Sequence, residues 1–175
     1  MEIYKPAEDS FLLAKLVEKE IKKNKIIKVL DMGSGSGIQA ETAIKSGINP
    51  KDIFLVDINP DAIKSLKKKF PKSKILLSDL FSKIPKTQKF DLIIFNPPYL
   101  PNDKFDKEFD TSGGKSGSSI INLFLKNAEK YLSEKGRILL LTSSFTKRID
   151  WQDYEKELLG NDRVFFEELS VWELS

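Results

Sequence analysis

Apolar runs alternate with stretches of helical periodicity along most of the chain. Leu12, Leu13, Leu16, Val17 and Ile21 recur at helical spacing behind two acids that favour a helix start, which predicts a helix over about 7–23. The same reasoning predicts helices over 38–46, 60–70, 119–132 and 150–159. Short runs rich in Ile, Leu, Val and Phe predict strands over 26–30, 53–57, 74–77, 90–95, 136–142, 163–168 and 169–173.

These strands and helices alternate, and several of the strands are nearly continuous in apolar residues. Strands of that kind are buried on both faces, as in a parallel sheet that is covered by helices. The pattern therefore predicts an α/β fold with a doubly wound, mostly parallel seven-stranded sheet and helices on both faces. The chain has 175 residues with both signs of charge well mixed, and we expect one domain over 1–175.

Polar residues lie at the ends of four predicted strands. Asp31, Asp57, Asp79 and Asn96 each come at or just after such an end. Ligands of doubly wound sheets bind beyond the carboxyl ends of the strands, at the point where the strand order reverses. We therefore expect these four side chains to converge on one edge of the sheet.

The composition narrows the available chemistry. The chain has no cysteine and no histidine, which excludes thiol nucleophiles, imidazole bases and the usual zinc sites, so we expect no bound metal. The formal charge of +3 is too small to indicate a nucleic-acid partner by itself. No apolar run is long enough to span a bilayer and no signal peptide is recognisable, so we expect a cytoplasmic protein with no membrane partner.

The sequence Asn96-Pro97-Pro98-Tyr99 follows the buried run 90–95. Neither proline can donate to a strand ladder, so the chain must leave the sheet at Asn96. Each proline fixes its own φ and restricts the residue before it, which makes the turn stiff. A stiff turn that carries an amide and an aromatic ring is suited to hold a small planar group, although a purely structural turn is an equal alternative for this motif alone.

A glycine loop follows the first predicted strand, with Gly33, Gly35 and Gly37 leading into a helix. Glycines allow a tight turn and let a ligand approach bare backbone at a helix N-terminus. Asp57, about twenty residues further on, is placed to accept hydrogen bonds from both hydroxyls of a ribose. A single aspartate at such a position more often caps a turn, but three after successive strands favour a nucleoside ligand. Asp79 would then accept from the adenine amino group, and Leu80 would pack on the ring.

With these residues in place, the chain resembles the class I S-adenosylmethionine-dependent methyltransferases. Within them it is similar to the HemK-type release-factor glutamine methyltransferases, in particular their short archaeal and eukaryotic branch. The resemblance is carried by residues 4–13, the glycine loop 31–37, residues 57–60 and residues 96–100.

The resemblance implies a Rossmann-like fold, S-adenosyl-L-methionine as cofactor and S-adenosyl-L-homocysteine as product. It implies that Asp31 and Gly33 line the methionine and ribose part of the cofactor, that Ser10 lies near the methionine end, and that Asn96 contacts both cofactor and substrate. It also implies a peptide chain release factor as substrate and a small zinc-binding activator protein as partner. Thr111 and Ser118 replace a tryptophan and an arginine of the family, in the long polar loop 97–118.

The leading hypothesis is methyl transfer to the side-chain amide nitrogen of a glutamine. The Asn96 side-chain oxygen and the Pro97 carbonyl would accept from the amide N–H groups, and Tyr99 would stack on the planar group. Methylation of an exocyclic amine in DNA or RNA is the alternative, because that group is also planar and bears N–H donors. Protein lysine methylation is a weaker variant, and a catalytically idle scaffold subunit is a third hypothesis.

Overall fold

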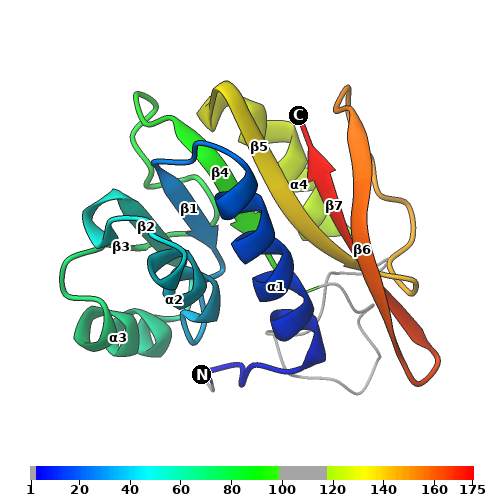
Figure 1. Cartoon of the computed structure of the whole chain (residues 1–175), viewed down its shortest axis with the longest axis horizontal. Helices are drawn as coiled ribbons and strands as arrows, with labels where there is room; N and C mark the ends of the chain where they lie inside the picture. The colour runs from blue at the N-terminus through cyan, green and yellow to red at the C-terminus, as the bar shows by residue number, and fades with distance from the viewer. Residues whose placement is uncertain (1–2, 99–117) are drawn as a thin grey trace.

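A seven-stranded sheet forms the centre of the molecule (Figure 1). The structure is a computed structural model that describes residues 3–98 and 118–175. The strands are β1 (Val29–Met32), β2 (Ile53–Asp57), β3 (Lys74–Leu77), β4 (Phe90–Phe95), β5 (Leu132–Ser143), β6 (Lys156–Val164) and β7 (Glu167–Leu174). Their order is β3-β2-β1-β4-β5-β7-β6. The pairings among β1 to β5 are parallel, whereas β7 is antiparallel to both of its neighbours. The predicted doubly wound, mostly parallel sheet is confirmed.

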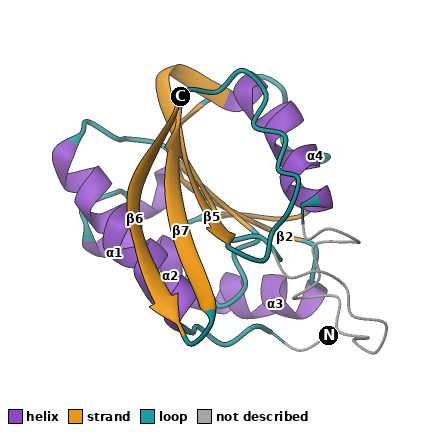
Figure 2. Ribbon diagram, turned by 90° about the vertical axis from the view of Figure 1, so that its right-hand side faces the viewer, coloured by secondary structure: helices purple, strands orange, loops and turns teal. Residues whose placement is uncertain are grey.

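Helices cover both faces of this sheet (Figure 2). The helices are α1 (Glu8–Lys23), α2 (Ile38–Lys45), α3 (Pro60–Lys69) and α4 (Ser119–Ala128), with 3-10 turns at Pro50–Asp52 and Glu129–Tyr131. The first three helices and one face of the strands form one apolar cluster, around Leu13, Ala40 and Leu66. On the other face, α4 packs with Phe81, Phe90 and neighbouring strand residues in a second cluster. The sheet is therefore buried on both sides, as the continuous apolar strands required.

The strand order reverses between β1 and β4. From β1 the chain continues outward to β2 and β3, and then returns to place β4 on the other side of β1. The two helices that follow β1 and β2 have different N-terminal caps. Gly37 begins α2 with φ +78°, and a Cβ at this position would lie 2.4 Å from the Phe70 ring. Asn59 begins α3 with its side chain accepting from the Asp61 N–H, ahead of Pro60 in the first turn.

The secondary structure predicted for the C-terminal part of the chain was wrong. The predicted helix over 150–159 does not form, because residues 156–164 pair with β7 as strand β6. The predicted strands 163–168 and 169–173 are replaced by the end of β6, a turn at residues 165–166, and β7. The charged residues of this segment have good helix propensity, and antiparallel pairing outweighs that preference. Three smaller shifts occur elsewhere. β1 occupies Val29–Met32 instead of 26–30, α4 ends at Ala128, and β5 begins at Leu132.

The sequence predicts no membrane-spanning segment, and the structure describes the helices within residues 3–98 and 118–175. None of the helices in these ranges combines the length and the apolar character that crossing a bilayer requires.

Candidate functional site

A cavity of about 620 Å³ lies where the strand order reverses, at the carboxyl ends of β1, β2 and β4. Its volume is in the range that holds a cofactor-sized molecule. Nine of the predicted site residues line this one cavity: Ser10, Asp31, Gly33, Gly35, Asp57, Asp79, Leu80, Asn96 and Pro97. Tyr99, Thr111 and most of the loop 97–118 lie outside the described residues. The expected convergence of the four strand-end residues is confirmed.

The glycine loop is hydrogen-bonded to the end of β2. Gly33 and Gly35 have φ of +65° and +50°, a region that glycine adopts without the cost of a side chain. The Gly35 N–H donates to Asp57 Oδ2 at 2.7 Å, and the Asn59 N–H donates to Asp57 Oδ1 at 2.8 Å. The Asp57 carboxylate is therefore held in one orientation by backbone donors. Each of its oxygens still has a lone pair for a further donor such as a ribose hydroxyl.

Asp31 is a buried acid on the floor of the cavity, with 2% of its surface exposed. Its Oδ2 accepts the Ala40 N–H of helix α2 at 3.2 Å. Burial, with the negative charge of Asp57 as a smaller cause, raises the pKa of Asp31 to about 8, against the opposing hydrogen bonds from Ala40 and Ser34. A positively charged group of a ligand would stabilise the ionised form of this buried carboxyl group.

Asp79 and Leu80 form another side of the cavity, just after β3. Leu80 has φ +43°, which is unusual for a residue other than glycine, asparagine or aspartate. The turn is held by Ser78, whose Oγ donates to the Leu80 carbonyl at 2.9 Å and accepts the Lys83 N–H at 3.0 Å. Strained backbone of this kind is often found at ligand sites. The turn places an exposed carboxylate beside an apolar side chain at the cavity.

Asn96 is oriented by an acid from the other end of the chain. Its Nδ2 donates to Asp9 Oδ2 at 2.9 Å. The other Asp9 oxygen accepts the Tyr4 hydroxyl at 3.0 Å and the Ser10 N–H. Burial and the Asp9 charge raise the pKa of Tyr4, so its hydroxyl stays protonated and donates. Because an ionised carboxylate only accepts, Asn96 must turn its NH₂ group toward Asp9 and its oxygen away from it.

Two amide oxygens at the cavity are buried without a hydrogen-bond partner among the described residues. They are Asn96 Oδ1 and Gln39 Oε1. The Gln39 NH₂ group donates to the Ser10 carbonyl at 3.0 Å, which turns its oxygen away from that contact. Buried acceptors nearly always have a partner, so these two indicate a ligand or substrate that brings N–H donors into the cavity.

Sequence reasoning missed Asp9, Tyr4 and Gln39 as site residues. Asp9 occupies the first turn of α1, where an acid is explained by the helix dipole alone. The structure instead buries it, with 4% of its surface exposed, beside a residue 87 positions away. The available signal was the resemblance of the 4–13 segment to the family, which contained all of these neighbours except Gln39.

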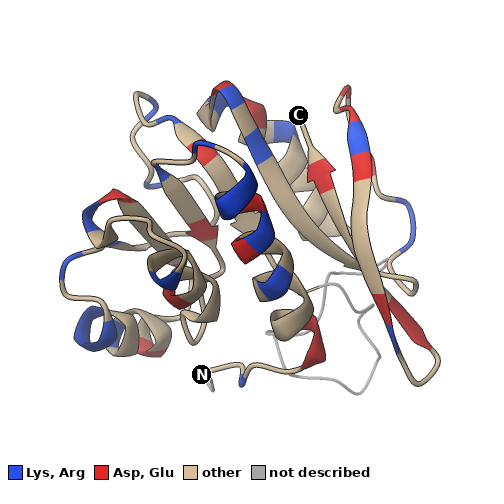
Figure 3. Cartoon of the chain, viewed as in Figure 1, with Lys and Arg blue, Asp and Glu red and all other residues tan. Residues whose placement is uncertain are grey.

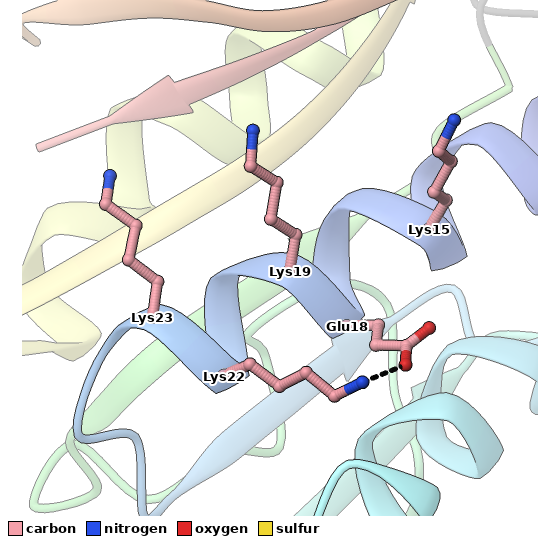
Figure 4. A pocket seen from close by; sticks show the side chains of 5 residues that line it. All are labelled: Lys15, Glu18, Lys19, Lys22 and Lys23. Atoms are coloured by element: carbon pink, nitrogen blue, oxygen red, sulfur yellow. Dashed lines mark hydrogen bonds and ion pairs between the residues drawn. The ribbon is translucent and has the colours of Figure 1, made fainter.

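A second hollow lies on the outside of α1 and is not part of the cavity (Figure 4). Lys15, Lys19 and Lys23 extend from one side of the helix, and Lys22 contacts Glu18 at 2.5 Å. Their spacing of four residues places them in a row along the helix. Most of these charges lie in open solvent, as expected for the outer face of a surface helix.

The fold and the site together define the class of the protein. The strand order with an antiparallel β7, and a cavity at the reversal point that carries the glycine loop and the strand-end acids, are those of the class I S-adenosylmethionine-dependent methyltransferases. The crystal structure of a TehB-like SAM-dependent methyltransferase from Corynebacterium glutamicum has the same fold. It superposes with a TM-score of 0.64 over 93% of this chain and 86% of that chain, at 20% identity.

The sequence comparisons place the chain within this class. The methyltransferase small domain family matches residues 9–165. MJ0928 of Methanocaldococcus jannaschii, whose name gives protein N5-glutamine methyltransferase as an inferred activity, is 38% identical over 97% of this chain and 90% of its own. The eRF1 methyltransferase catalytic subunit mtq2 of Schizosaccharomyces pombe is 30% identical over 77% of this chain and 70% of its own. The chain belongs to the methyltransferase small domain family and, within it, to the HemK-type methyltransferases.

Proposed function

We propose that the protein transfers a methyl group from S-adenosyl-L-methionine to the side-chain amide nitrogen of a glutamine in a peptide chain release factor. The observation that carries this proposal is the orientation of Asn96. Its NH₂ group is held by Asp9, and its buried oxygen lacks a partner among the described residues. An acceptor that brings an N–H group into the cavity would satisfy this oxygen. The name of MJ0928 supports glutamine as that acceptor, and the name of mtq2 supports a release factor as the protein that carries it.

The cofactor fits the residues that line the cavity. Asp57 would accept from the ribose hydroxyls, while Asp79 and Leu80 would hold the adenine. Asp31, Gly33, Gly35 and Ser10 would line the ribose and methionine part. This lining suits a ligand with cationic groups, because Asp31 is buried beside the Asp57 carboxylate and its hydrogen bonds, from Ala40 and Ser34, come from uncharged groups.

The chain's own groups would then position the acceptor nitrogen. An amide nitrogen is a weak nucleophile because its lone pair is shared with the carbonyl group. Asn96 Oδ1 and the Pro97 carbonyl would accept its two N–H groups and stabilise the positive charge that develops as the new N–C bond forms and the S–C bond of the cofactor breaks. The extra proton leaves to water. Orientation of two bound reactants can supply roughly 7–11 kcal/mol of the barrier reduction. Tyr99 would stack on the planar acceptor, as the motif predicts.

The proposal also includes a partner subunit. We propose that a small zinc-binding activator protein covers the open end of the sheet at β3. Leu77 at the end of β3 is 50% exposed, and Ile58, next to its pairing partner Asp57, is 61% exposed. Apolar groups beside an open strand edge are suited to strand addition by another chain. We further propose that the protein acts as one domain in the cytoplasm, where release factors work.

Transfer of a labelled methyl group tests this function. The purified protein, with and without the activator, would be incubated with labelled cofactor and with release factor, total RNA or DNA in separate reactions. We expect label on the release factor only. The variant Asn96→Ala should lower the rate by roughly 10²–10³-fold, as the loss of one polar group at a reacting centre commonly does, while cofactor affinity changes little. Label on nucleic acid but not on protein would instead select the base-methylating alternative.

A further inference from the structure

The turn between β6 and β7 exposes two adjacent phenylalanines. Phe165 and Phe166 each have 89% of their surface exposed, the largest values among the exposed large apolar residues of the described chain. Neither side chain belongs to the two apolar clusters of the core. Surface hydrophobic residues that occur singly need no explanation, but a pair of fully exposed aromatic rings is typical of binding sites.

The backbone of this turn does not favour a phenylalanine. Phe165 has φ +54°, in the left-handed region that glycine and asparagine adopt at lower cost. A bulky residue in this conformation is an outlier, and it adds nothing to the core here. Folding therefore gives no reason for an aromatic residue at this position. Strained residues of this kind point to a function of the side chain.

The strand register places the turn at the end of the sheet where the parallel strands finish and the cavity lies. Phe95, the residue before Asn96, pairs with Leu140, which pairs with Trp172 in β7. Glu167 begins β7 five residues earlier, so the turn lies roughly 17 Å further out along the strand at the usual rise of a strand. In Figure 1 the turn is at the lower right, beyond the arrowheads of β1 and β4. The hairpin thus projects beyond the strand ends around which the cavity lies.

Two exposed apolar residues lie on segments that connect the hairpin with the cavity. Leu123 of α4 lines the cavity and is 51% exposed, and Phe145 is 42% exposed. The segment that carries Phe145 is tied to the hairpin by the Ser144 N–H, which donates to the Glu168 carbonyl at 2.8 Å. It is tied to α4 by Asn122, whose Oδ1 accepts the Asp150 N–H at 2.9 Å. A bound protein segment could follow these residues from the turn to the cavity.

The charges beside the turn favour a protein over a nucleic acid as the partner. Residues 162–168 carry three acids, Asp162, Glu167 and Glu168, and one arginine, Arg163. Figure 3 shows acidic colouring on both strands at this end of the hairpin. The neighbouring segment, which Ser144 ties to Glu168, adds Lys147 and Arg148, so the charges around the turn are mixed. A surface of mixed charge offers no basic patch to the phosphates of a nucleic acid or of an anionic membrane, and it suits a protein surface that combines apolar side chains with charges of both signs.

We propose that Phe165 and Phe166 are the docking point for the protein that carries the methyl acceptor. The proposal rests on the proposed function, because it takes the release factor as that protein. The two rings bind the factor outside the cavity and hold it while the acceptor side chain reaches Asn96. Docking of this kind raises the affinity for the intact factor without affecting a short peptide that contacts only the cavity.

The double variant Phe165→Asn/Phe166→Ser tests the proposal, since asparagine suits the left-handed turn and the fold should be kept. Methyl transfer would be measured with the intact release factor and with a short peptide that spans its acceptor. We expect the KM for the intact factor to rise about tenfold or more, with kcat at saturation and activity on the peptide within about twofold of wild type. The control Ile27→Ser removes a residue of 56% exposure just before β1, at the end of that strand opposite to the cavity, and should change neither.

Three results would overturn the docking proposal and leave the proposed function standing. An unchanged KM for the intact factor would do so, as would an equal loss of activity on factor and peptide. A wild-type dimer that the double variant dissociates, with the KM unchanged, would assign the two rings to contacts between copies of this chain. A wild-type protein that methylates neither substrate would contradict the proposed function first, and the docking proposal with it. Binding of the intact factor to Asn96→Ala, with and without the double variant, measures docking independently of turnover.

Discussion

At the scale of single residues, the site depends on a pair of side chains that the sequence keeps far apart. Asp9 and Asn96 are hydrogen-bonded across 87 positions, and the acid decides which end of the Asn96 amide faces away from it. The carboxylate accepts on both oxygens, from Asn96 on one and from the Ser10 N–H and the Tyr4 hydroxyl on the other. Asp9 is therefore a positioning residue for Asn96.

The variant Asp9→Asn should reverse the Asn96 amide. The fixed Ser10 N–H would select the oxygen of the new amide, which leaves an NH₂ group facing Asn96. Asn96 would then turn its oxygen toward residue 9 and its NH₂ group toward the acceptor, so kcat should fall roughly 10–100-fold with little change in cofactor affinity. Single-turnover kinetics and calorimetry separate the two effects. Tyr4→Phe, which keeps the carboxylate, is the matched control, and equal losses in both variants would argue against the positioning role.

Asp31 should release a proton when the cofactor binds. Burial raises its pKa to about 8, so the group is mostly protonated at pH 7 in the free protein. The cationic groups of S-adenosyl-L-methionine favour the ionised form, and the pKa should fall on binding. Calorimetry at pH 7 in buffers of different ionisation enthalpy should give heats that depend on the buffer. Asp31→Asn should abolish that dependence, and its persistence in the variant would assign the proton to another group.

The same shift affects the stability of the free protein. The unfolded chain loses this proton near its ordinary pKa of 3.8, whereas the folded chain keeps it until about pH 8. The folded state therefore binds more protons between these values, and the contribution of Asp31 to stability falls as the pH rises from about 4 to about 8. Asp31→Asn should flatten the pH dependence of unfolding in this range.

The sequence predicted most of the cavity lining for a physical reason. Asp31, Gly33, Asp57 and Asp79 stand at or just after strands, and parallel strands bring their carboxyl ends to one edge. Asp9 and Gln39 could not be found in this way, because they lie on helices whose rotation and depth depend on tertiary packing. Their helical positions are compatible with an ordinary structural role, so local pattern alone did not distinguish them.

At the scale of secondary structure elements, the parallel half of the sheet was predicted well and the antiparallel end was not. β2, β3 and β4 lie at the predicted residues because their apolar runs are short and are bounded by polar turns. β6 is an edge strand with most of its residues exposed, so it has neither a continuous apolar run nor a clean alternation. Its pairing with β7, which the local sequence does not encode, fixes its structure.

An ion-pair cluster joins α1 to this antiparallel end. Arg137 of β5 donates to Glu20 of α1 at 2.8 Å and to Glu173 of β7 at 3.3 Å. The Glu20 side chain is 3% exposed. Burial and the Glu173 charge raise the pKa of Glu20, against the attraction of Arg137. Arg137 is therefore the cation that allows a buried carboxylate between three elements.

The variant Arg137→Leu should lower the free energy of unfolding by about 3 kcal/mol at pH 7, because it leaves the Glu20 charge buried without its partner. Acidification should relieve part of this loss, since the pKa of Glu20 is raised and the neutral carboxyl is tolerated more easily. Urea unfolding at two pH values measures both effects. Arg163→Leu, at an exposed position of β6, is the control and should change stability little. A loss that does not depend on pH would contradict this account of Glu20.

At the scale of the whole molecule, the proposals assign different roles to different parts of the sheet. The parallel strands β2, β1 and β4 end around the cavity, where the backbone and the acids suit a nucleoside cofactor. The antiparallel hairpin of β6 and β7 extends past that edge and exposes two phenylalanines. The lysine row of α1 lies outside the cavity, so the basic charge of the chain is not gathered at the cofactor site.

The most direct test of this account is tandem mass spectrometry of the release factor after incubation with the protein and S-adenosyl-L-methionine. We expect a mass increase of one methylene on the side chain of a single glutamine. The increase should be absent when Asn96→Ala replaces the wild-type protein. A methyl group on a lysine or on nucleic acid, or one on glutamine that forms equally well with Asn96→Ala, would contradict the assignment of this site.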